Sequence, residues 1–211
     1  MPLDSTFVSI LDYIGVFVFA LSGAWVAIRR DLDLVGVVTL SLVTGLAGGV
    51  FRDVFVADLP PVAVREAWYL AVAGAAAVVA VAIPRPDAAL ARLVVALDAV
   101  GLGLFAVVGA TKAAEAGIGI AGGAVVGTVS AIGGGLLRDV LADEVPQVFR
   151  PGSRLYVIPA LLGALVVGVA AEIEIDEAVA AATAAVMVTT LRLLAVRYGW
   201  NAPLPRRHSA A

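Results

Sequence analysis

The chain alternates long apolar stretches with short polar connections. Prolines and glycines mark several connections, at Pro60-Pro61, Pro84-Arg85-Pro86, Pro146 and Pro151-Gly152. A helix needs about 20 residues to cross about 30 Å of hydrocarbon, so the third and sixth stretches are short but adequate. The pattern predicts seven transmembrane helices, at about residues 7–28, 34–57, 67–83, 90–112, 118–142, 155–171 and 177–196.

Composition supports an all-α integral membrane protein. Of the 211 residues, 62% are hydrophobic and 15% are charged, and the mean hydropathy is +1.03. A typical soluble domain is about 45–50% apolar and about 25% charged. The net charge of −3 and the lack of a dense basic patch argue against a nucleic-acid partner. We expect a single transmembrane domain over residues 1–211.

The N-terminus, from Met1 to Asp4, lacks the basic region of a cleaved signal peptide, so the first apolar stretch is expected to remain as a span. Arginines favour the cytoplasmic side of membrane proteins. Here they gather in alternate connections and in the C-terminal tail. This predicts an N-terminus outside, a cytoplasmic C-terminus, and a location in the inner (plasma) membrane.

An internal repeat is visible when the chain is shifted by 86 residues. Asp12 then falls on Asp98, Gly48-Gly49 on Gly134-Gly135, and Arg52-Asp53-Val54 on Arg138-Asp139-Val140. Each copy holds three predicted spans, an odd number, so the copies would enter the membrane from opposite sides. We predict two inverted repeats, at about 7–83 and 90–171, and an extra helix at about 177–196.

Glycine clusters occupy the second and fifth predicted spans. Three consecutive glycines exceed what close helix packing requires, and glycine weakens a helix by about 1 kcal/mol. One interpretation is a local break or bend whose carbonyls, with nearby hydroxyls, face a polar path. Packing of small residues, with hydroxyls bonded to their own helix, is the alternative. The candidate pore-lining or bend residues are Ser41, Thr44, Gly45, Gly48, Gly49, Thr128, Ser130, Gly133, Gly134 and Gly135.

Each glycine cluster is followed by an arginine near one end of its span. We expect two repeat-related ion pairs, Asp12 with Arg52 and Asp98 with Arg138, one at each mouth, with a structural or gating role. The alternative is that the arginines reach the lipid headgroups. Adjacent Arg52 and Asp53 point about 100° apart on a helix, so we expect them to be poor partners for one another.

No enzyme is expected. The spans contain no Ser-His-Asp set, histidine cluster or carboxylate cluster, and the chain has no cysteine for disulfides or thiolate metal sites. His208 lies in the tail and is expected to be solvated. The acidic run Glu172–Glu177 fits a solvated loop better than a cation site. We therefore predict no catalytic residue, no metal and no cofactor.

The doubled Gly-Gly-x-x-Arg-Asp motif, within seven spans and a three-plus-three repeat, resembles prokaryotic members of the trimeric intracellular cation (TRIC) channel family. That group overlaps a bacterial membrane family named for a duplicated "glycine transporter" domain. The resemblance covers about residues 7–196. It implies a homotrimer with one pore in each protomer, between the glycine-bent second and fifth helices, and potassium and sodium as permeant ions. A lipid-binding motif of animal members is not matched around Arg138.

The sequence thus favours a monovalent-cation channel in the lipid bilayer. The alternative is a secondary transporter of a small zwitterion such as glycine, because inverted repeats with broken helices also occur in transporters. A structural membrane protein without a transport role fits the doubled glycine motif poorly.

Overall fold

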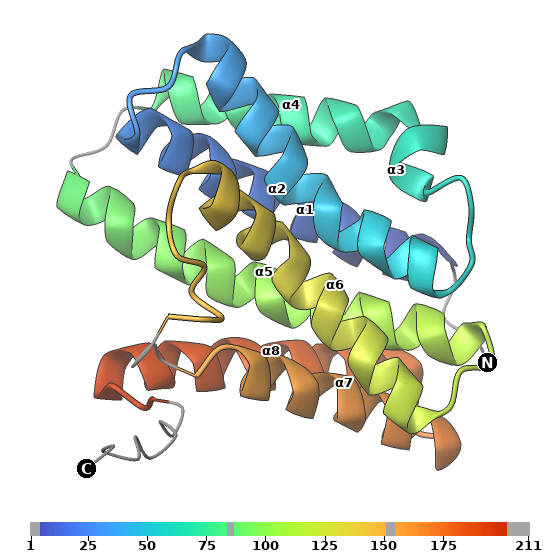
Figure 1. The fold of residues 1–211 in the computed structure, drawn as a ribbon. Helices are drawn as coiled ribbons and strands as arrows, with labels where there is room; N and C mark the ends of the chain where they lie inside the picture. Colours follow the sequence, from blue (N-terminus) through green and yellow to red (C-terminus); the bar gives the residue numbers. More distant parts are fainter. Residues whose placement is uncertain (1–4, 84–86, 151–154, 202–211) are drawn as a thin grey trace, which may run out of the picture.

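The computed structural model describes residues 5–83, 87–150 and 155–201, and the elements in these ranges are helices (Figure 1). The prediction of an all-helical protein is confirmed. His208 lies outside the described residues. The eight helices of the described ranges are α1 (Ser5–Arg29), α2 (Leu34–Phe55), α3 (Val62–Arg65), α4 (Ala67–Ala82), α5 (Asp87–Glu115), α6 (Ile120–Leu141), α7 (Val157–Glu172) and α8 (Glu177–Tyr198).

Five of these helices are long and apolar enough to cross a membrane: α1, α2, α5, α6 and α8. Helices α4 and α7 have 16 residues each, or about 24 Å at 1.5 Å per residue. The four-residue α3 was not expected, and it lies within the predicted connection after Pro61. Length and composition therefore identify five spans clearly and leave two shorter apolar helices.

Helices α1, α2, α5 and α6 form the centre of the bundle. Helix α4 packs on α1 and α2, whereas α7 and α8 pack on α5 and on each other. Helices α2 and α6 cross in opposite directions (Figure 1). Arg52 and Arg138 each lie four residues beyond a crossing glycine, Gly48 and Gly134 respectively, so they lie on opposite sides of the crossing.

The two halves make similar turns at positions 86 residues apart. Asp31 and Gly117 have φ values of 54° and 74° before α2 and α6. After these helices, Ala57 and Asp143 have φ values of 58° and 55°. The left-handed region is costly for residues with a Cβ atom. The same backbone geometry is thus retained in both halves even where the residue type differs.

Both glycine clusters lie inside uninterrupted helices, so the expected local break is wrong. A Cβ atom on Gly48 would overlap the Ser130 carbonyl, and one on Gly134 would overlap the Thr44 carbonyl. A Cβ atom on Gly45 would lie 2.9 Å from the Val16 carbonyl oxygen. Glycine therefore lets these helix backbones touch. An unpaired carbonyl in hydrocarbon would cost several kcal/mol, which favours an intact helix.

Two repeat-related phenylalanines lie beside the crossing. The rings of Phe19 on α1 and Phe105 on α5 are fully buried and stack with centroids 5.4 Å apart. A Cβ atom on Gly48 would lie 3.0 Å from the Phe105 ring, and one on Gly134 would lie 3.7 Å from Phe19. The centre of the bundle is therefore filled by aromatic side chains.

We expect Gly134→Ala to destabilise the protein by about 1–3 kcal/mol, because the added methyl group overlaps helix backbone that cannot rotate away. The matched control is Gly74→Ala on α4, where a Cβ atom meets nothing within 4 Å. The control should be neutral or stabilising by up to about 1 kcal/mol. Unfolding in detergent micelles measures both, and equal effects would contradict the packing role.

Candidate functional site

The first charge site consists of Asp12, Arg52, Asp53 and Tyr69, all buried. The Arg52 Nη1 atom donates to Asp12 Oδ1 at 2.9 Å. The Tyr69 hydroxyl donates to the second Asp12 oxygen at 3.0 Å. Helices α1, α2 and α4 thus meet at the Asp12 carboxylate, and the Asp12–Arg52 pair is present as the sequence predicted.

The second charge site consists of Ser22, Asp98, Arg138 and Asp139. Arg138 donates to Asp98 and forms an ion pair with it, so the second predicted pair is also present. The Ser22 hydroxyl on α1 donates to Asp98 Oδ1 at 2.7 Å and accepts from Arg138. In this site the guanidinium is therefore held by side chains of three helices, α1, α5 and α6.

Each arginine also binds its own neighbouring aspartate, which corrects the expectation that they are poor partners. Arg52 Nε lies 2.9 Å from Asp53 Oδ1, and Arg138 Nη2 lies 2.8 Å from Asp139 Oδ1. The flexible stem of arginine lets the guanidinium reach a carboxylate about 100° away around the helix. Both arginines are at least 98% buried, so neither reaches the headgroups as the alternative required.

The same aspartates hold the connection that follows each helix. The second oxygen of Asp53 accepts from the Val62 backbone amide at 2.9 Å. The second oxygen of Asp139 accepts from the Gln147 backbone amide at 2.9 Å. Sequence reasoning missed this role, although the repeated Arg-Asp pair was its signal. Each site thus links a buried arginine to the connection that follows its helix.

The two sites differ in charge and in the side chains that contact their surroundings. Lys112 on α5 lies 3.6 Å from Asp53 of the first site. The repeat-related position of Lys112, 86 residues earlier, is the uncharged Val26. Around the second site, Arg192 of α8 donates to the Leu155 carbonyl at 3.0 Å and to Gln147 Oε1 at 2.7 Å. Arg192 also lies 4.7 Å above the Tyr156 ring. Neither Lys112 nor Arg192 was singled out from the sequence.

The candidate hydroxyls bond mostly to helix carbonyls. Thr44 and Thr128 donate to the carbonyls four residues earlier at 2.6 Å and 2.7 Å. Ser41 lies 3.0 Å from the carbonyls of both Ala20 and Ala73. Ser130 is buried, and its hydroxyl has no hydrogen-bond partner among the described residues. The contacts of Thr44 and Thr128 match the alternative of hydroxyls bonded to their own helix, whereas Ser41 bonds to carbonyls of α1 and α4.

The other candidate glycines lie against side chains. Gly49 lies beside the Arg52 guanidinium, and Gly133 lies against Phe51. A Cβ atom on Gly135 would lie 2.8 Å from the Tyr156 hydroxyl. The cavity beside Asp12 and Arg52 measures about 10 Å³, close to the smallest volume that holds one water. The described structure therefore packs this region closely.

A surface cluster joins the α1–α2 turn to the connection after α6. Arg30 Nη2 lies 2.7 Å from Glu144 Oε1, and Arg150 Nη2 lies 3.4 Å from Glu144 Oε2. Partial burial raises the pKa of the Glu144 carboxyl, but the hydrogen bonds and charges of Arg30 and Arg150 outweigh this and hold the pKa below its ordinary value of 4.5. The cluster links the two halves outside the membrane core.

These features define a multi-pass integral membrane protein with two repeat-related buried charge sites. The chain belongs to the family described as Glycine transporter, whose sequence profile matches residues 9–85 and again residues 95–172. It is 43% identical over 196 residues to a UPF0126 membrane protein of Streptomyces coelicolor, covering 92% of this chain and 89% of that protein. It is 32% identical to the UPF0126 inner membrane protein YadS of Escherichia coli K12, covering 92% and 93%.

Solved TRIC channel structures share this fold. The TRIC orthologue from Rhodobacter sphaeroides is 33% identical, with a TM-score of 0.85, and the match covers 92% of this chain and all of that one. A structure described under conductance through TRIC cation channels is 31% identical, with a TM-score of 0.84 and coverage of 96% and 98%. The resemblance to TRIC channels and to the duplicated family is therefore confirmed.

We expect Arg138→Met to destabilise the protein by about 3–5 kcal/mol, because two buried carboxylates lose their cation. Adding Asp98→Leu should recover part of that loss, because it removes one uncompensated carboxylate. The control is Arg65→Met, since Arg65 pairs with Asp58 at the surface and such pairs contribute about 0–1 kcal/mol. Unfolding in micelles gives the values, and a double variant less stable than Arg138→Met would contradict the pairing.

Glu144 should make stability depend on pH. Its lowered pKa means that the contribution is fully present above pH 4.5 and is lost as the pH falls through the lower folded-state pKa. We expect Glu144→Gln to cost about 0.2–1 kcal/mol at neutral pH and almost nothing once the carboxyl is protonated. Melting temperatures from pH 7 to pH 3 check this, with Glu172→Gln as the control. A constant difference at all pH values would exclude this titration as the cause.

Proposed function

We propose that this protein is a channel for monovalent cations, potassium and sodium, in the cell membrane, with one pore in each protomer of a homotrimer. The observation that carries the proposal is the doubled charge site, Asp12–Arg52–Asp53 and Asp98–Arg138–Asp139, on a fold shared with TRIC cation channels.

The proposed path runs between α2 and α6, flanked by one charge site on each side of their crossing. Each site places two aspartates around one arginine. Lys112 offsets the extra carboxylate of the first site, so the net excess of carboxylate lies at the second site. An excess of carboxylate favours cations over anions at a pore mouth. The arginines would then act as positioning groups for the aspartates, in addition to neutralising them.

We infer that the described conformation is closed. The helix backbones touch at Gly48 and Gly134, and the Phe19–Phe105 pair fills the space beside them. An apolar constriction can stop ions by excluding water. Opening therefore requires α2 and α6 to separate or the two rings to move.

The proposed topology has seven spans in two inverted repeats, with the N-terminus outside and the C-terminus in the cytoplasm. It counts α4 and α7 as short spans beside the five long ones. The family profile matches once in each half, and α2 and α6 cross in opposite directions, as inverted repeats require.

Planar-bilayer recording of the purified protein tests the proposal. A potassium chloride gradient should give discrete openings whose reversal potential lies toward the potassium equilibrium potential. We expect Phe105→Ala to raise the open probability several-fold, because it removes half of the aromatic stack. The control is Phe55→Ala, an exposed residue of α2, which should leave openings unchanged.

The alternative of a small-zwitterion transporter predicts a different result. Saturable uptake of labelled glycine into proteoliposomes without discrete openings would overturn the channel proposal. Openings that persist while glycine uptake stays at the level of empty vesicles would support it.

A further inference from the structure

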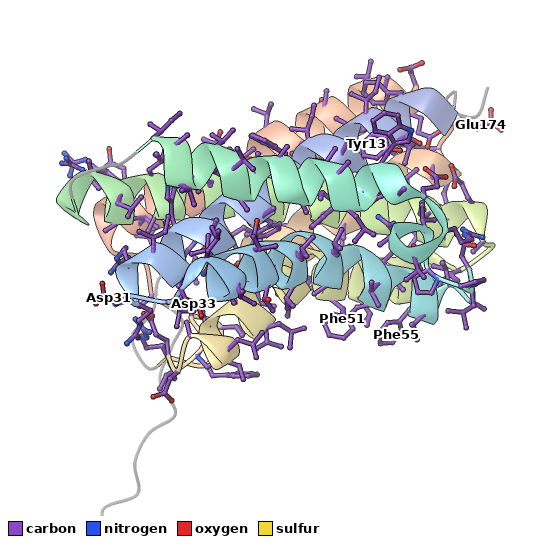
Figure 2. The ribbon with its side chains drawn as sticks, turned by 90° about the horizontal axis from the view of Figure 1, so that it is seen from above. Tyr13, Asp31, Asp33, Phe51, Phe55 and Glu174 are labelled. Carbon is purple, nitrogen blue, oxygen red and sulfur yellow. The ribbon has the colours of Figure 1, made fainter. Side chains whose placement is uncertain are left out.

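A cavity of about 580 Å³ opens where α5 ends and α8 begins. Four acidic side chains line it: Glu115 at the end of α5, Glu174 and Asp176 in the α7–α8 connection, and Glu177 at the start of α8. The described residues that line it include no basic side chain. Figure 2 places Glu174 at the same end of the bundle as Tyr13 and away from Asp31 and Asp33.

Thr111 gives this cavity a buried polar atom. Thr111 is 3% exposed and lines the cavity, and its hydroxyl has no hydrogen-bond partner among the described residues. Thr44 and Thr128 instead donate to carbonyls of their own helices. A buried hydroxyl without a partner costs about 1–3 kcal/mol. This cost points to a ligand that satisfies the hydroxyl.

The arrangement of acids argues against a compact metal site. No group of three or more Asp, Glu, His or Cys residues in the described part of the chain is placed to hold a metal ion. The acids instead lie on three segments, the end of α5, the α7–α8 connection and the start of α8, around a cavity whose volume is within the range of small-molecule sites, about 300–1,000 Å³. A ligand with several separated positive charges matches such a wall better than one point charge does.

We propose that this acidic cavity binds a small organic polycation of the polyamine class. Its ammonium groups would donate charge-assisted hydrogen bonds to the carboxylates. One ammonium would also donate to the Thr111 hydroxyl oxygen. This inference concerns binding alone and does not depend on whether the protein conducts ions.

Calorimetric titration of spermidine into the full-length protein in detergent micelles tests the proposal. We expect saturable binding that weakens as salt rises from about 0.05 M to about 0.5 M, because the charges are partly exposed to screening. The double variant Glu115→Gln with Glu174→Gln should raise Kd by about tenfold or more, equivalent to losing two charged contacts. The control is Asp58→Asn, an exposed carboxylate outside the cavity, which should change Kd by less than about twofold.

The hydroxyl provides a second, independent test. Thr111→Val has the same shape, so it should raise Kd about threefold to tenfold without lowering the melting temperature of the free protein. Equal weakening by Asp58→Asn, or an unchanged Kd in Thr111→Val, would overturn the proposed site. Displacement of spermidine by magnesium chloride at equal concentration would overturn the polyamine class in favour of a metal ion. Failure of binding with channel openings intact would overturn this inference and leave the proposed function standing.

Discussion

The burial of two guanidinium groups in an otherwise apolar helical bundle is the constraint on which this structure depends. A charged side chain in hydrocarbon is stable only when it is paired and its donors are satisfied. Arg52 and Arg138 meet this condition by binding two aspartates each. Those aspartates come from α1 or α5 and from the arginine's own helix. The charge sites therefore fix the central helices relative to one another. The second carboxylate oxygens of Asp53 and Asp139 also hold the loops after α2 and α6, because they accept hydrogen bonds from loop backbone amides.

The two halves share this design but have diverged in detail. The first site has Tyr69 on Asp12 and Lys112 near Asp53. The second has Ser22 between Asp98 and Arg138, and Arg192 of α8 braces the connection beside it. Lys112 compensates the excess negative charge of the first site, whereas the second keeps that excess. A duplicated site with unequal charge would give the two sides of the bundle different electrostatic surroundings.

Much of this arrangement was predictable because it follows from spacing. The 86-residue shift aligns Asp12 with Asp98 and Arg52 with Arg138. Because a buried charge needs a partner at matching depth, each aspartate could be assigned to the arginine of its own repeat. Helix boundaries were close to those found, because apolar length sets them. The local contacts were not predictable. Glycine runs favour a break by propensity alone, but tertiary contact between backbones at Gly48 and Gly134 decides in favour of intact helices. The Arg52–Asp53 contact depends on a side-chain rotamer that helical wheel geometry does not capture. The functional role of each candidate remains a prediction.

The division of contacts between the halves bears on how such a bundle could move. Asp12, Arg52, Asp53 and Tyr69 all belong to the first repeat, and Asp98, Arg138 and Asp139 all belong to the second. The strongest pairs therefore hold each repeat together internally. Between the repeats lie the glycine faces of α2 and α6 and the stacked rings of Phe19 and Phe105. Polar contacts also cross between the repeats, from Ser22 to Asp98 and Arg138, from Lys112 to Asp53, and from Arg30 to Glu144. Apolar faces and single hydrogen bonds can rearrange at a lower cost than buried ion pairs can break. Relative motion of two rigid repeats would thus preserve the arginine–aspartate pairs of both charge sites, while it would separate the helices between them and break the contacts of Ser22 and Lys112.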